Sequence, residues 1–292
     1  MKAGERVKER LREVRSRLPW VDHAVRAYDR NSQVLGSQLA GAVTYFGFLS
    51  FFPLLALAFS FVGYVSAVYP EAQAEVTQAV EGAFPSLVGS EEGQINIQDV
   101  IDAKAGAGVI GLLGLLYAGL GWLDALRDAL RRVFGTQDVA IGLLKKKVVD
   151  VAVLVMLGTA LLLSLVVSSL ATGATSQALD AVGLADSLTA TVLLRLLSVA
   201  LAMAVDVAIF AILLTRLSGA HPPWRQVRSG ALLAAAGFEA LKLLGTYLIA
   251  NVTSNPLYAT FGVVVGLLVW INLNSKLTVF AAAWVATHPY SL

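Results

Sequence analysis

The sequence predicts an all-α, polytopic membrane protein with six transmembrane helices and both termini in the cytoplasm. Three observations lead to this class of fold. Of the 292 residues, 57% are hydrophobic and only 14% are charged, whereas ordinary soluble domains are roughly 25% charged. Long runs nearly free of charge recur along the chain. Lys and Arg residues gather in alternate connections between these runs, which is typical of cytoplasmic loops.

The membrane domain is expected to be a single unit that covers residues 34–292. Each apolar run is long enough for the ~20 residues that cross a bilayer as a helix. Several runs are longer than that, so we expect tilt, kinks or interfacial extensions. The predicted spans are 34–68, 105–123, 151–179, 187–216, 229–250 and 257–287.

Residues 1–33 form a basic segment ahead of the first span. Residues 1–30 contain nine Lys and Arg residues. The stretch KERLREVRSRLPW is helical in composition, and two interpretations are open. It is either a solvated helix or an interfacial amphipathic helix attracted to anionic headgroups, since each basic residue near the surface adds about 1 kcal/mol.

The first span contains a proline in its middle, within YFGFLSFFPLLALAF (45–59). Pro53 removes one helical hydrogen bond and clashes with the carbonyl of Leu49, at a cost of about 3 kcal/mol. Ser50 stands three residues earlier, and serine hydroxyls can satisfy backbone groups that a membrane proline sets free. We therefore expect a kink at Ser50 and Pro53, either a static bend or a hinge beside a cavity.

The connections between the runs give the orientation. Residues 71–104 carry seven acidic residues and only Lys104 as a base, whereas 124–150 carry six Lys and Arg residues and 216–228 carry three. The connections 180–186 and 251–256 contain no Lys or Arg. This alternation predicts that 71–104 is an outer loop. Part of that loop is expected to be an amphipathic helix, because its apolar residues recur at helical spacing.

Charged residues inside the later spans are the main candidates for function, because each costs about 2.5–3.5 kcal/mol to insert. At ~1.5 Å of rise per residue, Arg195, Glu239 and Lys242 share an outer-to-middle layer. Asp206 and Lys276 would pair nearer the cytoplasm. Two interpretations are open: pairs that hold the fourth to sixth spans together, or a polar cavity that binds an anionic headgroup or relays protons. For Lys276, a side chain that reaches the interface is a further alternative.

The last span also contains residues suited to helix packing. Asn272 is expected to form an interhelical hydrogen bond. Gly262 and Gly266 form a G-x-x-x-G motif, and the second span contains many glycines. Such spacing lets helix backbones approach closely, either within one chain or between two. The sequence thus leaves open a monomer or a homodimer.

Three stretches resemble the YihY/BrkB family of bacterial inner-membrane proteins. They are AGAVTYFGFLSFFPLLALAF, HPPWRQVRSGALLAAAGFEALKLLGTYLIAN and YATFGVVVGLLVWINLNSK, from the first, fifth and last spans. Many members have Gly-Ala-Glu in the last span, where this chain has Ala281, Ala282 and Ala283. This difference, together with Lys276, makes the chain similar to the YhjD branch.

The resemblance implies a role in the cell envelope, because family members have been linked to the traffic of lipid or lipopolysaccharide. It favours a transporter, or a transport accessory, for a lipid or another amphiphilic anion. The expected partners are membrane lipids and envelope lipid-transport proteins. The alternative is a scaffold that moves nothing and docks envelope machinery through its acidic outer loop.

The family was once labelled a ribonuclease, and the residues argue against an enzyme. His23, His221 and His288 are expected to be isolated from one another near membrane ends, and no group has the spacing of metal ligands. No basic stretch with interleaved aromatic residues indicates nucleic acid. We therefore expect no metal, no cofactor and no catalytic residues. The chain also lacks a G-x-x-x-x-G-K-[ST] phosphate loop, so an ion gradient or a partner would have to drive transport.

Overall fold

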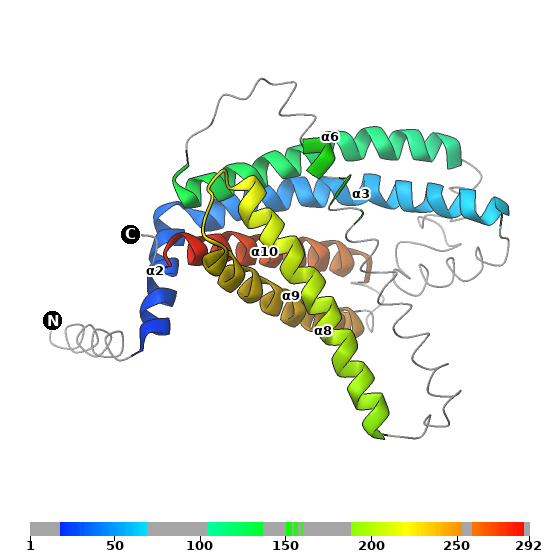
Figure 1. Ribbon diagram of the computed structural model, residues 1–292. Coiled ribbons are helices and arrows are strands. Elements are labelled where there is room, and N and C mark those ends of the chain that lie inside the picture. Colours follow the sequence, from blue (N-terminus) through cyan, green and yellow to red (C-terminus); the bar gives the residue numbers. More distant parts are fainter. Residues whose placement is uncertain are drawn as a thin grey trace. The chain divides into compact units, whose positions relative to one another are not determined.

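The computed structural model describes residues 18–68, 104–136, 150–153, 155, 156, 159, 188–252 and 259–288 (Figure 1). In this part of the chain, every regular element is a helix. The elements are α2 (Pro19–Gln33), α3 (Gly36–Val68), α6 (Lys104–Phe134), α8 (Leu188–Ile212), the π-helical turn η1 (Leu213–Leu217), α9 (Trp224–Val252) and α10 (Ala259–Ala286). The predicted all-α class is thus confirmed for the described residues.

The described helices coincide with most of the predicted spans. Four helical stretches among them are long and apolar enough to cross a membrane, namely Gly36–Leu57, Gly108–Phe134, Ala200–Leu217 and Val264–Ala286. The chain is therefore a polytopic membrane protein. The third predicted span and the acidic outer loop lie largely outside the described residues. The total of six spans and the cytoplasmic position of both termini are still predictions.

The second span is longer than the sequence predicted. α6 continues to Phe134, three turns beyond the expected end at residue 123, and so includes Arg127 and Arg131. The helix ends where Gly135 adopts a positive φ of 70°, a backbone conformation that favours glycine after a helix. The backbone N–H of Thr136 then donates to the Arg131 carbonyl at 3.0 Å.

Residue contacts divide the chain into two compact units. The first unit comprises Met1–Leu39, Arg127–Glu239 and Lys276–Leu292, and the second comprises Ala40–Leu126 and Ala240–Ser275. All contacts described below lie within one unit or the other.

Small residues bring α9 and α10 together in the first unit. A Cβ added to Gly230 would collide with the Val285 side chain and lie 3.1 Å from the Ala281 carbonyl oxygen. Ala231, Ala234 and Ala235 of α9 are completely buried. On α10, Ala281, Ala282 and Ala283 are also completely buried. Close approach of two backbones is the usual packing mode of membrane helices that have small residues at their contact.

A seam of glycines joins α6 to α3 in the second unit, where the two helices run side by side (Figure 1). The ring of Pro53 lies against Gly114, with its Cγ 2.9 Å from where a Cβ would be. Gly111 lies over the Pro53 carbonyl and the Leu57 amide, and Gly121 lies against the Phe46 ring. The predicted close approach through the second-span glycines is therefore confirmed at these positions.

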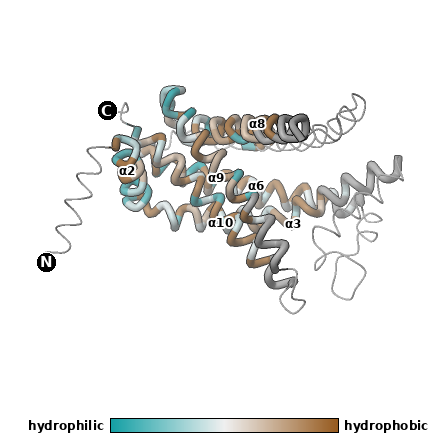
Figure 2. Tube along the Cα trace, turned by 90° about the horizontal axis from the view of Figure 1, so that it is seen from below, coloured by the Kyte–Doolittle hydropathy of each residue, from teal (hydrophilic) through white to brown (hydrophobic). Residues whose placement is uncertain are grey.

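Many large apolar side chains of the second unit point away from its core. Ile110 and Tyr117 of α6 are 72% and 74% exposed, and Tyr45 of α3 is 63% exposed. In a soluble protein such exposure would be unfavourable, whereas lipid can cover it in a membrane. By contrast, α2 mixes hydrophilic and hydrophobic residues along its length (Figure 2).

Candidate functional site

The strongest candidate site in the described chain is the contact between α8 and α9 in the first unit. Asp206 of α8 is only 6% exposed, although the helix around it is apolar. Phe210, one turn later on the same face, packs edge to face against Phe238 of α9, with ring centroids 6.0 Å apart. Glu239 follows Phe238 directly and is half-buried. One buried and one half-buried acidic residue thus lie on these two helices within four residues of the aromatic contact.

The helix changes its winding directly after this contact. Residues Leu213–Leu217 form a π-helical turn, and Leu213, Leu214 and Leu217 are buried. The Thr215 hydroxyl donates to the Ala211 carbonyl at 2.7 Å, which provides a hydrogen-bond donor where the helical pattern changes. Turns of this kind are rare and are often found at functional sites. This turn was not predicted from the sequence.

The other predicted charges have different surroundings. Arg195 lies on α8, but its side chain is outside the described residues, so its pairing with Glu239 stays a prediction. Lys242 is half-buried on the part of α9 that belongs to the second unit. Lys276 is exposed on α10, as expected of a side chain that reaches the interface. Its predicted pairing with Asp206 also stays a prediction.

Asn272 makes an interhelical hydrogen bond in the second unit. Its Nδ2 donates to the Thr44 hydroxyl oxygen of α3 at 3.1 Å. The same hydroxyl donates to the Ala40 carbonyl at 2.6 Å, so both groups are oriented by their bonds. This side chain links α10 to α3, which agrees with the packing interpretation of Asn272.

The predicted role of Ser50 is wrong. Its hydroxyl donates to the Phe46 carbonyl at 2.8 Å, four residues earlier, rather than to the Leu49 carbonyl that Pro53 sets free. The reason is geometric, because a serine on a helix reaches the carbonyl of the preceding turn most readily. The α3 helix is continuous from Gly36 to Val68 with Pro53 inside it. The predicted kink at Pro53 stays a prediction.

The two glycines of the last span also differ in what is described. A Cβ added to Gly266 would meet nothing within 4 Å among the described residues. The surroundings of Gly262 lie outside the described residues. Packing through this motif, within one chain or between two, is therefore still a prediction.

A buried ion pair in the first unit was missed. Arg127 of α6 donates from two guanidinium nitrogens to the two carboxylate oxygens of Asp150, one of them at 3.0 Å. The side chains are 7% and 0% exposed. From the sequence, Arg127 was expected in a loop, because the apolar run of the second span ends at residue 123. The signal was an acidic residue directly before the third apolar run.

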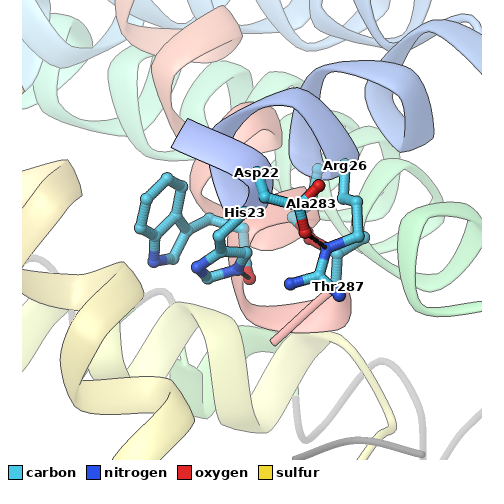
Figure 3. A network of polar contacts seen from close by, with 6 residues as sticks. Asp22, His23, Arg26, Ala283 and Thr287 are labelled. Atoms are coloured by element: carbon cyan, nitrogen blue, oxygen red, sulfur yellow. Dashed lines mark hydrogen bonds and ion pairs between the residues drawn. The ribbon is translucent and has the colours of Figure 1, made fainter. Parts of the chain in front are cut away.

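A second missed cluster joins α2 to the C-terminal end of α10 (Figure 3). His23 Nε2 lies 2.8 Å from the Trp284 carbonyl oxygen. The ring centroids of His23 and Trp284 are 3.9 Å apart. The His288 ring stands edge-on to His23 at 5.3 Å. The expectation that the histidines are isolated is thus wrong for this pair, because α2 folds back onto the end of α10.

Burial is the main cause of a lowered pKa at His23. The neighbouring His288 and Arg26 lower this pKa further, whereas the hydrogen bond to Trp284 and the charge of Asp22 act in the opposite direction. The neutral ring that donates from Nε2 to the Trp284 carbonyl is therefore the favoured form in the folded protein.

Arg30 fixes the other end of α2. Its Nε donates to the Val133 carbonyl at 2.8 Å, and a terminal guanidinium nitrogen donates to the Arg132 carbonyl at 3.3 Å. These carbonyls belong to the last turn of α6, where the amides of a continuing helix are missing. The Arg132 carbonyl also accepts from the Gly135 N–H at 3.3 Å. α2 is thus attached to the C-terminal ends of both α10 and α6.

The described residues include no group of three or more His, Cys, Asp or Glu side chains that could hold a metal ion. No ligand set for a metal is therefore assigned in this part of the chain.

Apolar spanning helices with buried charges define the class as a multi-pass membrane protein. Residues 27–292 match the family model described as virulence factor BrkB, so the chain belongs to the BrkB/YihY family of inner-membrane proteins. Inner membrane protein YhjD of Escherichia coli (strain K12) is 30% identical over 283 residues, which cover 94% of this chain and 83% of YhjD.

A second relative is an uncharacterized protein of Dickeya dadantii (strain 3937). It is 30% identical over 284 residues, which cover 95% of this chain and 86% of the relative. No solved structure matches the chain. The resemblance in the first, fifth and last spans, and the similarity to the YhjD branch, are confirmed.

Proposed function

We propose that this inner-membrane protein is a transporter, or an accessory of a transporter, for a lipid or another amphiphilic anion in the cell envelope. The observation that carries the proposal is the burial of Asp206, which is 6% exposed within an apolar helix. Ionisable residues inside membrane segments are costly, and they commonly mark substrate pathways or proton relays.

The surroundings of Asp206 favour a role in a change of helix packing over a fixed pair that only holds helices together. Its helix passes through the π-helical turn Leu213–Leu217 within two turns of the carboxylate, and such turns are frequently found at functional sites. Glu239, which follows Phe238 in the sequence, offers a second carboxylate on the neighbouring helix. A protonatable residue next to an irregular turn is suited to coupling proton binding to a change in helix packing. In this account the proton gradient drives transport and Asp206 is the coupling residue.

Reconstituted vesicles test this function. The purified chain is placed in liposomes that contain phosphatidylglycerol with a fluorescent headgroup label, and dithionite is added outside to bleach accessible probe. Under a proton gradient, the wild-type chain should increase the bleached fraction beyond that of empty liposomes. Asp206→Asn should abolish this increase without lowering the thermal stability. The matched control is Asp128→Asn, since Asp128 is exposed on α6 and its loss should change nothing.

Two outcomes would contradict the proposal. The first is a wild-type chain that moves no lipid probe in either direction of the gradient, which would favour the scaffold alternative. The second is normal translocation by Asp206→Asn, which would remove this carboxylate from the mechanism.

A further inference from the structure

α2 buries one face and leaves a second apolar face open. His23 and Ala27 are 6% and 0% exposed, and Arg30 reaches the last carbonyls of α6. Successive residues of an α-helix are turned by about 100°, so the spacing of these three residues places them on one side. This side of α2 faces the ends of α6 and α10.

The remaining surface of α2 is sorted into an apolar and a charged flank. Trp20 and Tyr28 are each 65% exposed. At helical spacing they share one flank with three half-buried apolar residues, and this flank is named the aromatic face: Trp20, Val21, Ala24, Val25 and Tyr28. The opposite flank carries the ion pair Asp22–Arg26, with 3.3 Å between Arg26 Nε and Asp22 Oδ2, and the exposed Asp29.

This three-way division exceeds what a solvated helix requires. A helix that lies on a protein in water needs one apolar face for the protein and polar residues elsewhere. Here the two largest side chains of the helix are exposed, and both are of the types enriched at membrane–water interfaces. Tryptophan and tyrosine suit this region because each has an apolar ring and a polar group.

We propose that α2 lies in the surface of the cytoplasmic leaflet, with its aromatic face inserted among phospholipid headgroups and its charged flank in water. Only Val34 and Leu35 separate α2 from α3, the first spanning helix, so α2 is held at a membrane boundary. Interfacial helices bury an apolar face about 5–10 Å into the headgroup region. The length and position of α2 fit this arrangement, which is independent of whether the chain moves a substrate.

A second exposed tryptophan in the same unit supports phospholipid as the partner of the aromatic face. Trp224 is the first residue of α9 and is 63% exposed. The exposed Arg225 follows it, which adds a cation for the negative surface of the inner leaflet. The connection before α9 is predicted to be cytoplasmic, as α2 is. Aromatic and basic side chains thus occur together at the boundary where the proposal places the bilayer surface.

The chain contains no cysteine, so single nitroxide labels can test the proposal directly. Tyr28→Cys and Trp20→Cys place a label on the aromatic face, and Asp29→Cys and Gln33→Cys place one on the charged flank. All four positions are exposed, so the variants should fold as the wild type does. Each variant is reconstituted in nanodiscs of phosphatidylethanolamine and phosphatidylglycerol. Collision of the label with oxygen, which concentrates in lipid, is compared with collision with a water-soluble nickel chelate.

The expected result is a division between adjacent residues. Labels at residues 20 and 28 should collide mainly with oxygen, and labels at 29 and 33 mainly with the nickel chelate. Preference for the nickel chelate at all four positions would overturn the proposal in favour of a solvated helix. Low collision with both reagents at residues 20 and 28 would also overturn it, since another part of the protein would then cover the aromatic face. If Tyr28→Cys does not fold, Trp20→Cys gives the same comparison.

Discussion

Arg127 and Asp150 form a two-point ion pair whose side chains are 7% and 0% exposed. One of the two hydrogen bonds, from the Arg127 guanidinium to Asp150 Oδ2, is 3.0 Å long. Such a pair must offset the free energy needed to remove two charges from water. It connects the last turns of α6 to the start of the next predicted span. These turns of α6 were expected from the sequence to be part of a loop.

Loss of one partner of this pair should be strongly destabilising. Arg127→Ala leaves the Asp150 carboxylate buried without its counter-charge, and the expected loss is about 3–5 kcal/mol. Replacement of both residues, Arg127→Met with Asp150→Leu, should cost much less than the sum of the single changes. Thermal unfolding in detergent measures both. Equal and additive losses would contradict the assigned pairing.

Close packing of α6 on Pro53 predicts that substitution of Gly114 is destabilising. Gly114→Ala should lower the stability by about 1–3 kcal/mol through overpacking, because the added methyl would lie 2.9 Å from the Pro53 ring. The matched control is Gly106→Ala on the same helix, where nothing described lies within 4 Å. The control should be neutral or slightly stabilising, since alanine favours a helix more than glycine does. Similar effects of the two changes would argue against the seam.

The contact of α2 with α10 should depend on pH. Burial lowers the pKa of His23 below the ordinary 6.5. Above pH 6.5 the imidazole is neutral in both the folded and the unfolded chain, and stability is at its full value. As the pH falls below 6.5, the unfolded chain takes up a proton first, so stability decreases until the folded pKa is passed.

The variant His23→Gln isolates this effect, because it retains an N–H donor for the Trp284 carbonyl but does not titrate. Melting temperatures of the wild type and the variant, measured between about pH 5 and 8, should approach each other as the pH falls. A constant difference across this range would show that His23 does not contribute to the pH dependence.

Much of the fold could be predicted from the sequence, because apolar runs and loop charges are long-range averages. The runs of α3, α8, α9 and α10 were located within a few residues. The end of α6 was not, since amphipathic turns at a membrane surface carry charges that interrupt an apolar run. The aromatic clusters of α2 and α10 were also missed. Their partners lie 261 residues apart, and no local pattern indicates which helix ends meet.

The candidate site was less predictable for a related reason. Depth along a span can be counted from the sequence, so Asp206 was found as a polar residue inside a span, and Asn272 was expected to bond between helices. The direction of each side chain cannot be counted in this way, and it decides which residues pair. The Ser50 hydroxyl illustrates the problem, since the local geometry of the helix determined which carbonyl accepts from it.

Arg195 and Glu239 are predicted to form a buried pair between the fourth and fifth spans. Arg195→Ala and Glu239→Ala should each destabilise the protein, and the double variant should lose less than their sum. An alternative outcome is diagnostic. If these residues bind an anionic substrate, Arg195→Ala should abolish transport with little loss of stability. Strictly additive losses of stability with transport intact would rule out both interpretations.

Orientation in the membrane is the claim on which the position of α2 in the cytoplasmic leaflet rests. Because the chain has no cysteine, single cysteines at Ser90, Ser254 and His221 can be probed with a membrane-impermeant maleimide in intact cells. The alternation of Lys and Arg predicts labelling at residues 90 and 254. Residue 221, in the exposed connection before α9, should react only after the membrane is permeabilised. Labelling of residue 221 from outside in intact cells, with 90 and 254 protected, would contradict the orientation and the placement of α2 in the cytoplasmic leaflet.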